Sequence, residues 1–183
     1  METKLKHVNG QCPDSPEFKY RKLREVAKRY NCNCLVEFGS YQGDCALFLE
    51  KDFQKIITIE PVKEYYDLSK EKLKKLGNLE IHNKKSLDFI KNDLDKIQDY
   101  TTLFWLDSHV QPPYQKNASN DLFTEVKNIF NSYSGKYVLL IDDYRLWSKF
   151  CHINDLISLL EKNSSELVET SDMVLAVPKS FRA

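Results

Sequence analysis

The sequence predicts an α/β fold in which helices cover both faces of a largely parallel β-sheet that ends in an antiparallel hairpin. Short runs rich in β-branched and apolar residues alternate with longer amphipathic stretches along most of the chain. Only residues 170–172 separate the last two apolar runs, and a parallel crossover needs about a dozen residues or more. No Pro/Gly/Ser linker interrupts the 183 residues, so we expect one domain over 1–183.

The expected strands are short, apolar and bounded by polar residues, as buried strands are. They are, in order, 34–38, 55–60, 79–82, 102–107 and 136–142, followed by a hairpin of 166–169 and 173–177.

Apolar residues at helical spacing predict the intervening helices. Their ranges are 16–30, 62–76, 86–97, 119–133 and 152–162, with a further helix starting near Asp44. Pro16 suits a first helical turn, Gly77 marks a helix end, and Ser86 is expected to cap the helix that it begins.

Composition excludes several classes of protein. The 27 Lys and Arg residues balance 27 Asp and Glu residues, so we expect no nucleic-acid partner, since such binding needs a basic surplus. No apolar run is long enough to span a bilayer, and the start lacks a secretory apolar core, so we predict no membrane partner and a cytoplasmic location. Five scattered cysteines indicate reduced thiols and neither a zinc site nor a disulfide framework.

The strongest local signal is Val36-Glu37-Phe38-Gly39-Ser40-Tyr41-Gln42-Gly43, where a buried strand runs into a small-residue loop and then a helix. Gly39 would let a ligand approach the backbone, and Gly43 would let the helix pack against the sheet. An ordinary tight turn between strand and helix is the alternative interpretation of this spacing.

Glu60 ends the second expected strand, at the distance from Gly39 where an acidic residue receives ribose hydroxyls in such folds. A solvated carboxylate at a strand end is the alternative. The acidic Glu37 beside the loop would repel a pyrophosphate but attract an ammonium group. This favours S-adenosylmethionine, whose methionyl end carries an ammonium, over NAD.

These segments resemble the first motif and the ribose-binding strand end, Ile59-Glu60-Pro61, of class I S-adenosylmethionine-dependent methyltransferases. The resemblance implies a Rossmann-like, seven-stranded, mostly parallel sheet with a C-terminal hairpin. It also implies cofactor contacts from Glu37, Gly39, Ser40, Tyr41, Gly43, Glu60, Pro61, Ser86, Leu87 and Asp107. Relatives often have an acidic residue just before the position of Ser86, where this chain has Lys85.

Acidic residues end two further strands, in Leu106-Asp107-Ser108-His109 and Ile141-Asp142-Asp143-Tyr144. If these strands are neighbours, as the resemblance implies, the carboxylates repel one another unless a cation offsets them. Asp107, Asp142 and Asp143 are therefore candidate Mg²⁺ ligands, as in metal-dependent catechol and macrolide-sugar O-methyltransferases, which the pattern also resembles. The alternative is that these residues are caps or cofactor contacts and that no metal binds.

His109 lies two residues after Asp107, and because histidines generally have a pKa suited to a general base, we predict that these two residues are catalytic. Arg145 would suit an acceptor that carries a carboxylate or phosphate. Residues 1–15 and the 110–120 loop are candidate lids.

We therefore expect methyl transfer from S-adenosylmethionine to an oxygen of a small-molecule acceptor, such as a sugar or a nucleotide-linked sugar. The first alternative is a non-catalytic module that binds a nucleoside or S-adenosylmethionine, and a nicotinamide oxidoreductase is the second. The sequence leaves the acceptor, the metal and the oligomeric state open.

Overall fold

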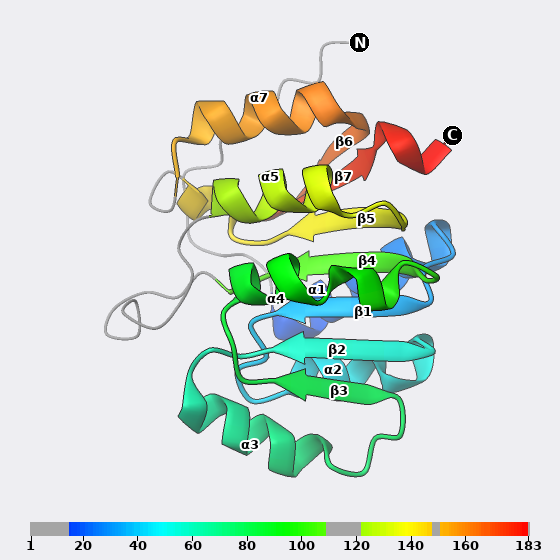
Figure 1. Cartoon of the computed structure of the whole chain (residues 1–183), viewed down its shortest axis with the longest axis vertical. Coiled ribbons are helices and arrows are strands. Elements are labelled where there is room, and N and C mark those ends of the chain that lie inside the picture. Colours follow the sequence, from blue (N-terminus) through cyan, green and yellow to red (C-terminus); the bar gives the residue numbers. More distant parts are fainter. Residues whose placement is uncertain (1–14, 109–121, 148–150, 183) are drawn as a thin grey trace.

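The computed structural model describes residues 15–108, 122–147 and 151–182 of the chain. These residues form a seven-stranded sheet with helices on both faces (Figure 1). The strand order is β3-β2-β1-β4-β5-β7-β6. Strands β1 to β5 are parallel, and β7 pairs antiparallel with both β5 and β6. The predicted Rossmann-like fold with a C-terminal hairpin is confirmed.

The strands at the centre of the sheet are short apolar runs that are buried along nearly their whole length. The bounds of the seven strands are β1 Cys34–Phe38, β2 Lys55–Ile59, β3 Leu79–His82, β4 Thr101–Leu106, β5 Lys136–Ile141, β6 Ser164–Thr170 and β7 Met173–Pro178. Most lie within one residue of the prediction, and β6 is longer because its pairing with β7 continues through the polar residues at its two ends.

The helices are α1 Pro16–Arg29, α2 Asp44–Leu49, α3 Lys63–Leu73, α4 Ser86–Asn92, α5 Leu122–Ser132 and α7 Ile153–Asn163. Helix α1 begins as predicted, with Pro16 in its first turn and the Ser15 hydroxyl accepting the backbone N–H of Phe18 at 3.2 Å. The helix expected over 86–97 is broken at Asp93, beyond which a 3₁₀ turn covers Leu94–Ile97.

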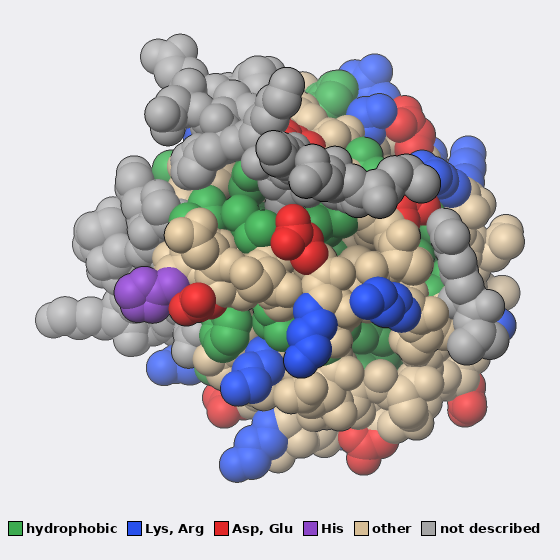
Figure 2. All heavy atoms as spheres, turned by 90° about the horizontal axis from the view of Figure 1, so that it is seen from above, with side chains coloured by type: hydrophobic (Ala, Val, Ile, Leu, Met, Phe, Trp, Pro, Cys, Tyr) green, Lys and Arg blue, Asp and Glu red, His purple; other side chains and the backbone are tan. Residues whose placement is uncertain are grey.

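Two apolar layers hold the helices to the sheet. Helices α1, α2 and α3 contribute to the layer on one face, and α4, α5 and α7 pack on the other (Figure 1). Acidic, basic and apolar side chains all lie on the face seen in Figure 2, in keeping with a formal net charge of zero. None of the helices in the described ranges combines the length and the hydrophobicity that a membrane span requires.

Hydrogen bonding between parallel strands continues one residue past each strand end. The backbone N–H of Asp107 donates to Phe38 at 3.0 Å, and that of Asp142 donates to Leu106 at 3.1 Å. Glu60 is held in the same way, its N–H lying 2.9 Å from the carbonyl oxygen of His82. The carboxyl ends of parallel strands form one edge of the sheet, so these acidic residues are brought to a common edge.

Candidate functional site

A pocket lies at this edge of the sheet, and its space, counted together with the open solvent at its mouth, is about 420 Å³. It is lined by Gly39, Tyr41, Glu60, Pro61, Val62, Tyr65, Asp107 and Ser108. Gly39, Tyr41, Glu60, Pro61 and Asp107 were predicted as cofactor contacts, whereas Val62, Tyr65 and Ser108 were not. The remaining predicted contacts, Glu37, Ser40, Gly43, Ser86 and Leu87, do not line this pocket.

Glu60 ties together the loops that follow β1 and β2. Its Oε2 accepts the backbone N–H of Tyr41 at 2.9 Å, and its Oε1 accepts that of Val62 at 2.8 Å. Burial raises the pKa of Glu60, although these two N–H donors oppose the shift. A carboxylate oxygen has more than one lone pair, so Glu60 can hold the loops and still accept ligand hydroxyls in the pocket.

Glu37 lies on β1, beside Thr58 of β2, and is buried. The Thr58 hydroxyl donates to Glu37 Oε2 at 2.7 Å and also bonds the Ser40 hydroxyl. Burial raises the pKa of Glu37 to about 7, and Thr58 and Cys45 oppose the shift through hydrogen bonds. The negative charge of Glu60 adds to the shift, so the two carboxylates interact even though Glu37 is not in the pocket wall.

The two glycines of the loop are required by their backbone geometry. Gly39 has φ +102°, and a Cβ at this position would lie 2.6 Å from the carbonyl oxygen of Asp107. Gly43 has φ +79°, and its Cβ would lie 2.8 Å from the Leu73 side chain. Gly39 therefore allows β1 and β4 to lie close to each other at the pocket. The close contact at Gly43 is with helix α3, whereas the sequence predicted a close contact between helix and sheet at this position.

At the ends of β4 and β5, a lysine from α1 meets the acidic residues. The Lys19 Nζ lies 2.5 Å from Asp142 Oδ2, and the Asp142 side chain is fully buried. Asp107 and Asp142 interact directly, and burial together with the charge of Asp142 raises the pKa of Asp107 well above its usual value. Burial raises the pKa of Asp142 too, although Lys19 opposes this. Burial alone would lower the pKa of Lys19, but the charges of Asp142 and Asp107 outweigh it and raise that pKa.

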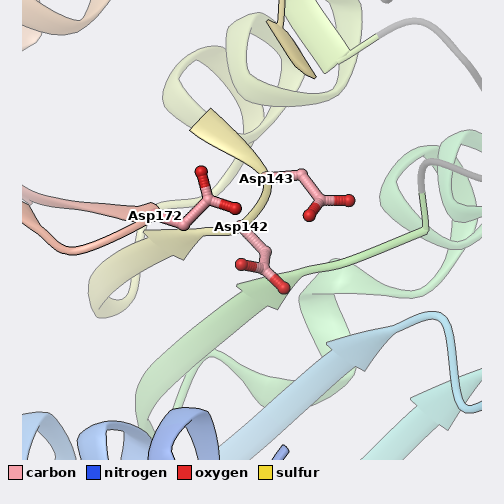
Figure 3. Close-up of side chains that lie close together, drawn as sticks. All are labelled: Asp142, Asp143 and Asp172. Atoms are coloured by element: carbon pink, nitrogen blue, oxygen red, sulfur yellow. The ribbon is translucent and has the colours of Figure 1, made fainter. Parts of the chain in front are cut away.

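A second acidic cluster lies alongside. Asp142 and Asp143 follow β5, Asp172 comes from the β6–β7 turn, and a carboxylate oxygen from each lies within 4.8 Å of the others (Figure 3). The guanidinium of Arg145 donates to Asp143 at 2.9 Å and pairs with Asp172. The Asp172 carboxylate also accepts the backbone N–H of Arg145 at 3.0 Å. Arg145 therefore pairs with two carboxylates of the protein itself, which the sequence did not predict.

These pairings bear on the predicted Mg²⁺ site. The sequence argument required a cation to offset the charges of Asp107, Asp142 and Asp143. Lys19 and Arg145 supply two cations within the protein itself. These two side chains thus supply the positive charge that the sequence argument assigned to a metal, while Asp142 Oδ1 is buried without a hydrogen-bond partner among the described residues.

Ser86 and Leu87, which the resemblance predicts as cofactor contacts, contact other parts of the protein. Ser86 is the first residue of α4 and does not cap it; Lys85 holds the N-cap position. The buried Ser86 hydroxyl donates instead to the carboxylate of Glu125 on α5, which is also buried. The Ser86 hydroxyl therefore links α4 to α5 and does not close the start of its own helix. Leu87 packs against the apolar layer under α4 and α5.

Some predictions fall outside the residues that the structure describes. They are the catalytic role of His109, the lid over 110–120 and residues 1–14 of the expected N-terminal segment.

Trp147 is fully buried, and its indole N–H donates to the carbonyl oxygen of Asp142 at 2.8 Å.

Sequence reasoning missed Lys19, Ser108, Glu125 and Asp172. Lys19 lies in an amphipathic helix like any surface lysine, and 123 positions separate it from Asp142. Ser108 alone carried a local signal, since it adjoins Asp107. Its hydroxyl oxygen is buried and has no hydrogen-bond partner among the described residues, which is typical of a group that meets a ligand or a water.

This architecture is similar to that of several solved methyltransferase structures. The O-methyltransferase TomG from Streptomyces achromogenes, involved in tomaymycin synthesis and solved in complex with SAM, is similar with a TM-score of 0.67 and 14% identity, over 91% of this chain and 82% of that chain. A methyltransferase from Geobacter sulfurreducens gives a TM-score of 0.63 at 14% identity, over 90% of this chain and 79% of that chain.

An O-methyltransferase from Bacillus cereus, solved with SAH, gives a TM-score of 0.60 at 12% identity, over 93% of this chain and 84% of that chain. No protein-family model and no curated protein sequence matches the chain. At these sequence identities the similarity concerns the fold alone. The strand order and the terminal hairpin described above agree with it. The chain therefore has the Rossmann-like fold of the class I S-adenosylmethionine-dependent methyltransferases.

Proposed function

We propose that the protein is an S-adenosylmethionine-dependent methyltransferase that acts on an oxygen of a small molecule. The observation that carries the proposal is the pocket at the carboxyl edge of the sheet, in which Glu60 lies between the loops after β1 and β2. The similar structures named above include O-methyltransferases solved with SAM or SAH, which supports the same activity. An acceptor such as a sugar or a nucleotide-linked sugar is part of the proposal.

The residues present fit the cofactor at both ends of the pocket. Glu60 offers carboxylate oxygens for ribose hydroxyls, and Gly39 leaves the backbone open where a side chain would meet Asp107. The buried hydroxyl of Ser108, without a partner among the described residues, offers a further polar contact. Glu37, behind the loop, adds a carboxyl group that a nearby ammonium would ionise.

The cofactor, when bound, supplies an electrophilic methyl group on a sulfonium. The protein's part is to hold the acceptor oxygen in line and to receive its proton, because positioning and deprotonation limit such reactions. Asp107 lies in the pocket wall and at the β4–β5 edge, so it can contact both cofactor and acceptor. His109, two residues beyond Asp107 in the sequence, stays the predicted general base.

Isothermal titration with S-adenosylhomocysteine tests the binding step. We expect wild-type protein to bind, and Glu60→Ala to bind roughly tenfold to a hundredfold more weakly, as when hydrogen bonds to a charged group are lost. Lys63→Ala is a suitable control, because its side chain is mostly exposed and its ammonium contacts Asp67 and the Tyr66 ring, neither of which lines the pocket. Absence of binding by wild-type protein would refute the proposal.

A second measurement tests the role of Glu37. Because its pKa is raised to about 7, most of the group is protonated just below neutral pH, and an ammonium nearby would drive the proton off. We expect binding at pH 6.5 to release a proton, measured by titration in buffers of different ionisation enthalpy. Glu37→Gln should bind without that release.

Methyl transfer itself separates an enzyme from a binding module. We expect Asp107→Ala and His109→Ala to lose turnover while retaining measurable binding of S-adenosylhomocysteine. Unchanged turnover in both variants would remove these residues from the mechanism.

A further inference from the structure

Lys19 occupies an unusual place for a lysine. It belongs to α1, yet its ammonium lies at the carboxyl edge of the sheet, 2.5 Å from Asp142 Oδ2. Its side chain is 15% exposed, and that of Asp142 is not exposed at all. Taking two charges out of water is costly, so an ion pair at such depth is not expected unless the fold holds it in place.

The surroundings of this ammonium are those of a bound cation. Asp107, which interacts with Asp142, lies in the wall of the pocket, and its charge also acts on Lys19. Asp143 and Asp172 complete the acidic edge, and Arg145 pairs with both. Two side-chain cations from distant parts of the chain thus divide the acidic edge between them.

We propose that Lys19 is the built-in cation of the β4–β5 edge and stands where a divalent ion would otherwise sit, so that this site works without a metal. The inference deepens the proposed function by adding a positioning residue to the same site. An ammonium differs from Mg²⁺ in that it carries one charge and donates hydrogen bonds, whereas Mg²⁺ demands six oxygen ligands in an octahedron. With Asp142 taking one N–H, the ammonium has further N–H groups to hold Asp107 or an acceptor oxygen.

The proposal predicts that removing the ammonium creates a metal site. In Lys19→Met the Asp142 and Asp107 carboxyl groups lose their cation but keep their oxygen ligands. Lys19→Arg keeps the charge, and Lys22→Met removes a lysine of the same helix that pairs on the surface with Glu25. These two variants separate the charge at position 19 from the general loss of a lysine from α1.

Manganese titration, followed by electron paramagnetic resonance, supplies the readout. We expect no Mn²⁺ binding by wild-type protein, Lys19→Arg or Lys22→Met below about 1 mM, and binding by Lys19→Met at least about tenfold tighter than in wild-type protein, because one positive charge has been removed next to two acidic groups. Thermal unfolding should show Lys19→Met melting roughly 6–12 °C below wild-type protein. Mn²⁺ should raise the melting temperature of that variant alone.

Two outcomes would overturn the proposal. One is wild-type protein that binds Mn²⁺ at micromolar concentration and is stabilised by it, which is measurable even if Lys19→Met does not fold. The other is folded Lys19→Met that gains no Mn²⁺ affinity. Titration of the same wild-type preparation with S-adenosylhomocysteine keeps the two hypotheses apart, since failure of that binding refutes the proposed function and leaves the manganese result standing.

Discussion

The two halves of the carboxyl edge of the sheet hold their acidic residues in different ways. At the ends of β1 and β2, Glu37 and Glu60 accept hydrogen bonds from neutral donors, namely a hydroxyl group, a thiol and two backbone N–H groups. At the ends of β4 and β5, Asp142 and Asp143 are paired with the cations Lys19 and Arg145.

The difference indicates which half can receive a positive ligand. Neutral donors leave the charge of a carboxylate uncompensated, whereas the charge of Lys19 opposes the rise that burial causes in the pKa of Asp142. A ligand that carries an ammonium therefore gains more at the β1–β2 half. The β4–β5 half already contains two cations, Lys19 and Arg145.

The largest expected effect comes from breaking the cation-paired half. Asp142→Ala leaves the ammonium of Lys19 without its nearest carboxylate, and we expect the free energy of unfolding to fall by about 3–5 kcal/mol, as for other broken buried pairs. Asp52→Ala is the matched control, since Asp52 pairs with the part-exposed Arg24 and should cost less than about 1 kcal/mol. Urea denaturation measures both, and equal losses would contradict the distinction.

Glu37, in the half held by neutral donors, should make the folding stability depend on pH. Between pH 4.5 and about 7 the unfolded chain ionises Glu37 while the folded protein keeps it protonated, so folding stability due to this group is present at low pH and is lost as pH rises through this window. The loss amounts to about 3 kcal/mol.

Glu37→Gln cannot ionise, and its denaturation curves should lack this contribution. The comparison requires denaturation of wild-type protein and variant at several pH values from 4.5 to 8. Parallel profiles of stability against pH for the two proteins would show that burial does not raise the pKa of Glu37 in the folded protein.

A smaller effect is expected at the junction of the halves, where Gly39 meets Asp107. Gly39→Ala forces a Cβ to within 2.6 Å of a backbone oxygen at a positive φ, which should cost roughly 2 kcal/mol. Gly77→Ala is the control, because nothing lies within 4 Å of its added Cβ, and a change below about 1 kcal/mol is expected. Thermal denaturation distinguishes the two variants; equal effects would mean that β1 and β4 can separate without cost.

Ser108→Ala should have the smallest effect on stability. Its hydroxyl has no partner among the described residues, so we expect the free energy of unfolding to change by less than about 0.5 kcal/mol. Affinity for S-adenosylhomocysteine or acceptor should instead fall by roughly twofold to tenfold, the contribution of one hydrogen bond. A marked loss of stability without a change in either affinity would assign Ser108 a structural role.

The fold could be predicted from the sequence because its elements are local. A strand such as Cys34–Phe38 is an unbroken apolar run, and the short Thr170–Met173 connection allows only antiparallel pairing. Helix boundaries were less predictable, as Asp93 shows: it turns back to pair with Lys84 and Lys96 and ends α4 early.

The site was predicted only where its residues follow a strand. Glu60, Asp107 and Asp142 could be located in this way, because strand ends in a parallel sheet share one edge. Their partners could not be located from the sequence. Lys19 pairs with Asp142, and Asp172 pairs with Arg145, only because the fold brings residues from distant parts of the chain together, and no sequence pattern marks either pair. A missing partner led to the expectation of a metal, where the chain supplies two side-chain cations of its own.

The double anchorage of Glu60 has a kinetic and entropic consequence. Because one side chain fastens the turns after two adjacent strands, the wall of the cavity is already arranged before any guest arrives. Because the wall is already ordered, ligand binding should cost little conformational entropy. Association should therefore be a simple one-step process, with no slow rearrangement of these turns.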